Sequence, residues 1–157
     1  MTLLQLIRIA EFVALKQPAI KTVVENDVFR LNALPNAKYG VFAWLQGTHQ
    51  ADVNESLQTF AFTFFYVDRL RTDGKNEIEV QSVGCEVLQN ILRVLSDEFG
   101  VEVAEYTLTN FNQRFTDACA GTFASVRLSV PVESGCAENN LGDFSLDFSD
   151  DFWTAIL

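Results

Sequence analysis

The sequence predicts an α+β domain in which an N-terminal helix and one long helix, residues 76–99, pack on a mostly antiparallel sheet of about five strands. Three observations lead to this fold class. Residues 57–67 alternate as in a strand, residues 76–99 follow with helical periodicity, and the chain order is helix, about three strands, helix, about two strands. The expected nucleus of the domain is therefore a strand followed by a helix that lies back on it.

The first helix is expected to begin at a capping box and to end before a proline. Thr2 and Gln5 have the spacing of a capping box. Pro18 disfavours helical geometry at Gln17, so the helix should end by that residue. Residues 19–24 are ambiguous.

Two strands are predicted before the aromatic strand. Residues 28–32 have the pattern of a short strand, which is followed by the turn residues Pro35, Asn36 and Gly40. Residues 41–46 have a stronger strand pattern. Residues 47–55 are polar and predict a loop that leads to the next strand.

The strand at 57–67 has one almost wholly aromatic face. Side chains alternate along a strand, so Phe60, Phe62, Phe64 and Tyr66 share one side of the sheet. Such a face needs a large cover, and the helix at 76–99 is the natural candidate. Its apolar stripe consists of Val80, Val83, Val87, Leu88, Ile91, Leu95 and Phe99.

The ends of this second helix are also marked in the sequence. Asn76 followed by Glu79 predicts a capping pair, and Gly100 is a good stop. Beyond the helix, residues 101–108 and 126–130 alternate as strands. Residues 110–117 either continue one of these strands or form a bend.

Composition limits the classes of function. The chain has 157 residues, which favours one domain, and 11 basic against 21 acidic residues give a formal charge of -10. This balance argues against a nucleic-acid clamp, which needs a basic face. Cys85, Cys119 and Cys136 have neither a disulfide-framework nor a zinc spacing. The chain shows no apolar run of membrane-spanning length and no signal-peptide pattern, so a cytoplasmic origin is expected.

No constellation of residues predicts an enzyme, and we expect no catalytic residue, no cofactor and no metal. His49 is the only histidine, and Asp52 is its nearest acidic neighbour in a polar stretch. Asp68 and Asp73 lack the ligand pattern of a calcium loop, so a charged strand-to-helix turn is expected there. Glu102 and Glu105 should point to opposite faces of their strand.

The chain changes character after residue 135, and we divide it into a single α+β domain at 1–135 and an acidic, aromatic C-terminal arm at 136–157. The arm has five acidic residues and no Lys or Arg. It cannot form its own core, so it is expected to dock on a neighbouring subunit or an adjacent protein. The alternatives are a frayed terminus and a helix packed on its own domain. The partner-binding residues are predicted to be Phe144, Phe148, Phe152 and Trp153.

Five segments of the chain resemble a known family: residues 39–44, 64–70, 76–82, 111–115 and 118–121. The family is that of small virion structural proteins in phages and prophages of gut Bacteroides-type bacteria, including crAss-like phages. The resemblance covers roughly residues 20–131. The order of elements is separately similar to that of phage tail terminator and tail-completion proteins, which form rings at the head-proximal end of a tail or within a head-to-tail connector.

The resemblance implies a structural protein of the bacteriophage neck or tail, located in the virion and assembled in the host bacterial cytoplasm. It implies a homo-oligomeric ring of six or twelve copies, with portal, connector or tail proteins as neighbours. Phage DNA would pass through the ring without specific binding, and no membrane would be involved. The alternative is a cytoplasmic α+β binding module that acts as a dimer.

Overall fold

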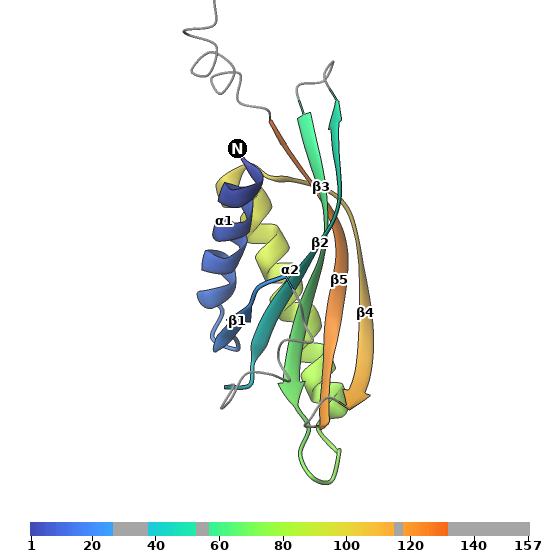
Figure 1. Cartoon of the computed structure of the whole chain (residues 1–157). Helices are drawn as coiled ribbons and strands as arrows, with labels where there is room; N and C mark the ends of the chain where they lie inside the picture. The colour runs from blue at the N-terminus through green and yellow to red at the C-terminus, as the bar shows by residue number, and fades with distance from the viewer. Residues whose placement is uncertain (27–37, 53–56, 115–117, 132–157) are drawn as a thin grey trace, which may run out of the picture.

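The computed structural model describes residues 1–26, 38–52, 57–114 and 118–131 (Figure 1). The predicted α+β class is confirmed: an N-terminal helix and one long helix pack on a five-stranded, mostly antiparallel open sheet. The elements in chain order are α1 (Leu3–Leu15), β1 (Thr22–Val24), β2 (Val41–Asp52), β3 (Leu57–Arg69), α2 (Glu77–Phe99), β4 (Glu102–Arg114) and β5 (Ala118–Pro131).

The five strands lie in the order β1-β2-β3-β5-β4. The short strand β1 is parallel to β2 and pairs only with Val41, Phe42 and Ala43. All other neighbours in the sheet are antiparallel. Both helices lie on the same side of the sheet (Figure 1), so its two faces have different surroundings.

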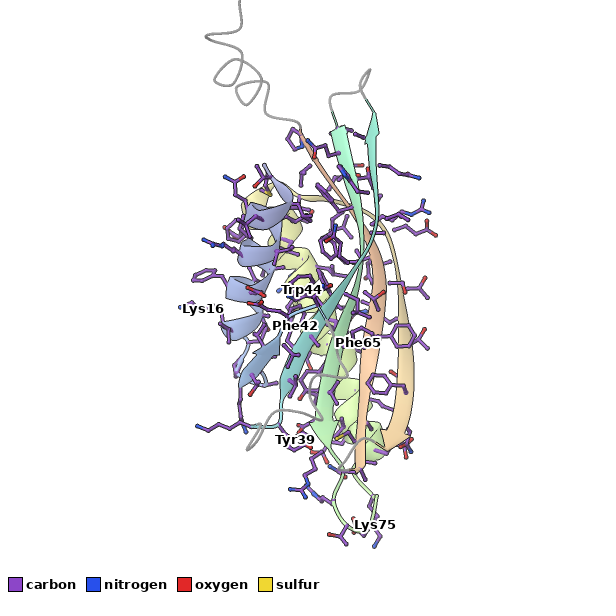
Figure 2. All side chains as sticks on the ribbon, in the orientation of Figure 1. Lys16, Tyr39, Phe42, Trp44, Phe65 and Lys75 are labelled. Carbon is purple, nitrogen blue, oxygen red and sulfur yellow. The ribbon has the colours of Figure 1, made fainter. Side chains whose placement is uncertain are left out.

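The aromatic face of β3 is buried under the helices, as predicted. Phe60, Phe62, Phe64 and Tyr66 are at most 4% exposed. The Phe62 and Phe64 rings stack with 5.6 Å between their centroids. The same core cluster contains the α2 residues Val80, Val87, Leu88, Ile91, Leu92 and Leu95. Figure 2 shows Phe42 and Trp44 on the side of the sheet that faces α1.

Helix α1 begins at the predicted capping box. The Thr2 backbone N–H donates to Gln5 Oε1 at 2.7 Å, and the Gln5 backbone N–H donates to Thr2 Oγ1 at 3.3 Å. The helix ends at Leu15, which agrees with the prediction from Pro18. Trp44 Nε1 donates to Glu11 Oε1 at 2.9 Å and so ties α1 to β2.

The predicted capping pair of α2 is wrong. Asn76 is the N-cap residue, but its side chain makes no capping hydrogen bond. It accepts instead from the Arg71 backbone N–H at 2.8 Å and donates to the Arg69 carbonyl at 3.2 Å. Glu79 lies 3.9 Å from Arg71 in an exposed ion pair. The Asn76 side-chain amide therefore stabilises the turn that precedes α2. At the other end of α2, the predicted stop at Gly100 is confirmed, because Gly100 is the C-cap residue and has a left-handed φ of 63°.

One strand boundary differs from the predictions, and two stretches that the sequence left open are resolved. The stretch 47–55 was expected to be a loop, but β2 continues to Asp52. The first strand, β1, lies in the stretch 19–24 that the sequence left ambiguous, and the predicted strand at 28–32 lies outside the described residues. Residues 110–114 continue β4 rather than forming a bend. Backbone pairing to β3 and β5 extends these strands past the end of their apolar alternation.

Helix α2 packs tightly against β5 at Gly84. A Cβ atom built at Gly84 would lie 2.8 Å from Thr122 Oγ1 and 3.0 Å from Tyr66 Cδ1. The Thr122 hydroxyl is buried and lies 2.8 Å from Asn110 Oδ1 and 3.0 Å from the Gln81 carbonyl oxygen. The missing side chain at Gly84 thus allows a buried polar contact between the helix and the sheet.

Candidate functional site

The side of the sheet away from both helices is here named the open face. Along β3 it carries Thr59, Ala61, Thr63 and Phe65, which alternate with the buried aromatic residues and are all half-buried. Directly opposite residues in an antiparallel pair share a face. The open face therefore continues across β5 and β4 through the partners of these residues.

One end of the open face is apolar. Five buried residues form a second, smaller cluster: Val24, Val41, Ala43, Val67 and Cys119. Beside them, the rings of Phe65, Phe111 and Phe123 contact one another with centroid separations of 5.8–6.5 Å. A Cβ atom at Gly121 would collide with the Tyr66 carbonyl oxygen and lie 2.9 Å from Phe111 Cζ, so only glycine fits beneath this aromatic trio.

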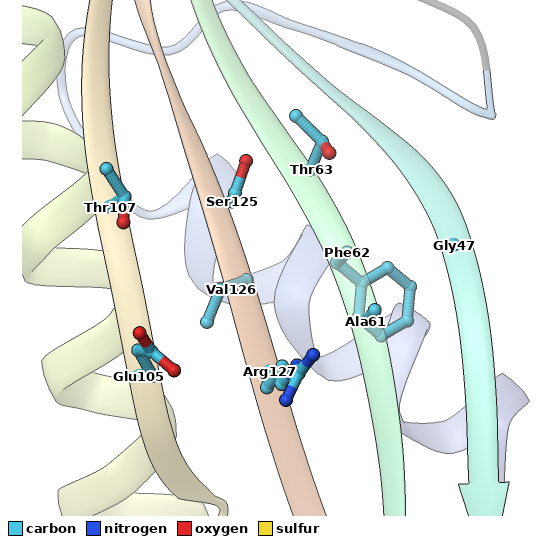
Figure 3. A pocket seen from close by; sticks show the side chains of 9 residues that line it. All are labelled: Gly47, Ala61, Phe62, Thr63, Glu105, Thr107, Ser125, Val126 and Arg127. Atoms are coloured by element: carbon cyan, nitrogen blue, oxygen red, sulfur yellow. The ribbon is translucent and has the colours of Figure 1, made fainter.

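The middle of the open face is polar and hollowed. Thr59 Oγ1 and Ser129 Oγ are 2.8 Å apart. Next to them, a shallow hollow is lined from four strands by small or hydroxyl-bearing residues and by one pair of opposite charge (Figure 3). The lining includes Gly47, Ala61, Thr63, Glu105, Thr107, Ser125 and Arg127. Small side chains in the middle of the sheet create this hollow beside the longer side chains of Glu105 and Arg127, which pair across β4 and β5.

The prediction that Glu102 and Glu105 point to opposite faces is wrong. The register of β4 against β5 shifts between Val103 and Glu105, so Glu102 pairs with Ser129 and Glu105 pairs with Arg127. Ser129 and Arg127 are two residues apart on β5 and share the open face. One extra residue in the edge strand, a β-bulge, therefore brings both glutamates to the same face.

His49 lies on β2 rather than in the predicted loop. Its ring stacks on Phe60 with 4.5 Å between centroids and an interplanar angle of 14°. Because it pairs with Phe60, it stands on the side of the helices and away from the hydroxyl-lined hollow. The arrangement therefore does not combine the one histidine of the chain with the hydroxyls of Thr63, Thr107 and Ser125.

The carboxylates at the end of β3 and in the turn to α2 act within their own turn, as predicted. Asp68 Oδ1 accepts from the Arg69 backbone N–H at 2.7 Å, and Asp73 Oδ1 accepts from the Lys75 backbone N–H at 3.2 Å. Tyr66 donates its hydroxyl hydrogen to Asp68 Oδ2 at 3.3 Å. Burial, with the nearby Asp68 charge as a second cause, raises the pKa of Tyr66 above its ordinary value.

Among the described residues, no group of three or more His, Cys, Asp or Glu side chains could hold a metal ion. Cys85 is a half-buried thiol whose Sγ lies 3.4 Å from Asn110 Oδ1. The predicted absence of catalytic, cofactor and metal sites stays a prediction for the chain. No helix in the described ranges has the length and apolarity that crossing a membrane requires.

The sheet has two long edges with a bonded neighbour on one side only. Of the five described strands, β4 (Glu102–Arg114) is the last at one edge, and only β5 pairs with it. At the other edge, β1 covers residues 41–43 of β2, and no other described strand pairs with the outer side of residues 44–52. Unpaired backbone groups along such edges can accept a further strand.

The predicted partner-binding residues Phe144, Phe148, Phe152 and Trp153 lie outside the described residues, as does the rest of the arm at 136–157. Their role therefore stays a prediction. The edge of β2 could not be recognised in the sequence as a candidate site, because the polar composition of residues 47–55 predicts a loop.

Comparison with known proteins adds no family to these observations. No protein family model matches the chain, and no curated protein matches it. The resemblance to small phage virion proteins therefore remains a prediction, and the geometry of the sheet is the basis for a proposal about function.

Proposed function

We propose that this chain is a structural subunit of a bacteriophage neck or tail, of the tail terminator, tail-completion or head-to-tail connector type, and that it assembles into a ring. The observation that supports ring assembly is the pair of unlike edges of the described sheet, β4 on one side and residues 44–52 of β2 on the other, which no described strand covers. Pairing between two different patches is a heterologous interface, and such an interface closes into a ring when the rotation between neighbouring copies divides a full turn.

The strand directions favour this mode of assembly. The sequence of strands β2-β3-β5-β4 alternates in direction at every step. The two edge strands consequently run in opposite directions. A second copy placed beside the first without inversion would bring its β2 edge antiparallel to β4, which extends the same ladder pattern. Six or twelve copies related by rotation could then share one continuous sheet.

The open face suits the wall of a channel for DNA. With the helices on the outside of the ring, the hydroxyl-bearing residues of the hollow and the pair Glu105 and Arg127 would face inward. The described open face carries Arg127 beside Glu102 and Glu105, and the chain has a net charge of -10. A wall without a basic patch does not release the counterions of DNA, so it would let the duplex slide.

Electron microscopy of the purified full-length chain tests the proposal, with a variant of the β4 edge beside it. Thr107 and Thr109 are exposed on β4. Replacing both by lysine places charge along the edge and disfavours the addition of a strand. Replacing both by valine keeps the strand propensity and serves as the control.

We expect rings of six or twelve copies for the wild type and the valine variant, and none for the lysine variant with unchanged circular dichroism. Rings that survive the lysine substitutions would show that β4 is not the interface. A second candidate function is the dimeric binding module, because β4 can also pair antiparallel with β4 of another copy around a two-fold axis. Two-fold particles in the same images would favour that candidate.

A further inference from the structure

The outer side of α1 carries more apolar surface than an exposed helix normally shows. Only three of the 13 residues of α1 are polar, namely Gln5, Arg8 and Glu11. Its inner side is buried through Leu6, Ala10, Val13 and Ala14. On the outer side, Leu4, Phe12 and Leu15 are 58%, 55% and 56% exposed. A helix that is apolar on both sides is typical of one that is covered on both sides.

The charges beside these apolar residues are mostly basic. Glu11 accepts the hydrogen bond of Trp44 Nε1 and so faces the sheet. Arg8 and Lys16 are exposed, and the Lys16 ammonium lies 5.2 Å from the centroid of the Phe12 ring. We name this surface, made of Leu4, Arg8, Phe12, Leu15 and Lys16, the outer α1 surface. It fits a segment that is both aromatic and acidic.

The described chain ends beside this surface. The N-terminal ammonium of Met1 donates to the carbonyl oxygen of Pro131, the last residue of β5, at 3.2 Å. The described part of the chain therefore ends next to the N-terminal end of α1 (Figure 1). The sequence that follows includes the aromatic residues 144, 148, 152 and 153 and, from residue 136 on, five acidic residues without Lys or Arg.

We propose that the outer α1 surface is the docking site of the C-terminal segment 136–157 of the same chain, in place of the neighbouring subunit or adjacent protein that the sequence led us to expect. Phe144, Phe148 and Phe152 recur every four residues, a spacing that would place them on one side of a helix. That side would cover Leu4, Phe12 and Leu15. The acidic residues between the aromatics would pair with Arg8 and Lys16. The two surfaces would then be complementary in charge as well as in apolar area.

The length of the connection allows this docking. Pro131 and Phe144 are 13 residues apart, and such a stretch can span up to about 43–47 Å when fully extended. Helix α1 has 13 residues, so it is only about 20 Å long. The whole outer α1 surface is thus within reach. A tethered segment also has a high effective concentration at a site on its own chain, which favours this receptor over one on a neighbouring copy.

Chemical cross-linking of the full-length chain tests the proposal. Cys85→Ser and Cys136→Ser remove two of the three thiols, while the third, Cys119, is buried. A cysteine at Gln5, exposed on α1, and one at Ser149 in the segment are then joined by a short bifunctional maleimide. The control chain has its cysteine at Thr109, on the open face, in place of Gln5.

We expect an intramolecular product whose yield is about tenfold or more above the Thr109 control, as a high effective concentration implies. The yield should fall when Arg8 and Lys16 are both changed to glutamate, and it should persist in the charge-conserving double variant R8K/K16R. A covalent dimer as the main product would place the segment on a neighbouring copy and overturn the proposal. Equal yields from both cysteine positions, or yields unaffected by the charge reversal, would overturn it as well.

Fluorescence gives a second readout that needs no cysteine. Trp44 is buried at 8% exposure, so acrylamide quenching of the wild-type chain reports mainly on Trp153. We expect Trp153 to be protected at all protein concentrations and to become several-fold more accessible in Phe12→Ser, a change at an exposed position that leaves the core intact. Full accessibility of Trp153 in the wild type would contradict the docking. The inference does not depend on ring assembly, because both experiments succeed or fail with the monomer.

Discussion

Replacement of Leu88 by alanine tests whether α2 and the aromatic face of the sheet form one packed core. Leu88 is 0% exposed and belongs to the same cluster as Phe60, Phe62 and Phe64. Truncation of a buried leucine typically lowers the free energy of unfolding by about 2–5 kcal/mol. Stacked rings on β3 limit how far the surroundings can collapse into the cavity, so we expect the upper half of that range.

Urea unfolding and thermal melting measure the effect. For a chain of this size, about 1 kcal/mol shifts the melting temperature by roughly 2–4 °C, and Leu88→Ala should therefore lower it by about 7–20 °C. Ile78→Ala on the same helix is the matched control, because Ile78 is 82% exposed and its loss should cost less than about 0.5 kcal/mol. Equal melting temperatures for the two variants would refute the proposed packing of α2.

Three further predictions concern Gly84, Tyr66 and His49. Gly84→Ala should destabilise the chain by about 1–3 kcal/mol in urea unfolding despite better helix propensity, because the new methyl group meets Thr122 Oγ1; a stabilised variant would contradict this. Burial raises the pKa of Tyr66, so the unfolded chain ionises first and the free energy of unfolding should fall as pH rises above about 10. Tyr66→Phe should flatten that decline, and an unchanged slope would exclude the cause. His49→Ala should leave assembly, scored by electron microscopy, unaffected, because the β2 edge would pair through its backbone groups and the His49 ring stacks on Phe60 of its own sheet; loss of rings in this variant would contradict that reasoning.

The elements that the sequence predicted correctly are those whose boundaries or buried faces are determined by nearby side chains. The capping box at Thr2 and the stop at Gly100 are satisfied within a few residues. The alternation of β3 and the stripe of α2 correspond to two buried surfaces that cover each other. Each of these patterns has one dominant cause, the burial of apolar area or the satisfaction of a helix end.

The elements that sequence reasoning missed depend on pairing between distant residues. Residues 47–52 are polar, yet they form a strand because residues 57–60 supply backbone partners across the hairpin. A bulge between Val103 and Glu105 reverses the alternation of β4 and moves Glu105 to the open face. Asn76 is a residue type that often caps helices, but its side-chain oxygen accepts from the Arg71 backbone N–H instead of from an N–H of the helix. Neither a register shift nor this alternative hydrogen bond is visible in a local pattern.

The candidate site could be predicted only in part from the sequence, because it too depends on pairing between distant residues. Free edges and an open face are properties of the assembled sheet, which depends on strand order. The order β1-β2-β3-β5-β4 brings the last strand between β3 and β4, and no local feature of residues 118–131 indicates that insertion. The arm at 136–157, in contrast, is a prediction from composition alone, because its acidic and aromatic residues stand out in the printed sequence.

The most direct test of the proposed ring is the mass of the full-length chain in solution, measured by native mass spectrometry over a wide range of protein concentrations. The chain mass is 17.6 kDa, so each added copy is well resolved. Two unlike edges predict one dominant closed species of six or twelve copies, with few intermediates, because closure gives every copy both interfaces. A monomer or a two-fold dimer as the largest species at every concentration would contradict the proposed ring.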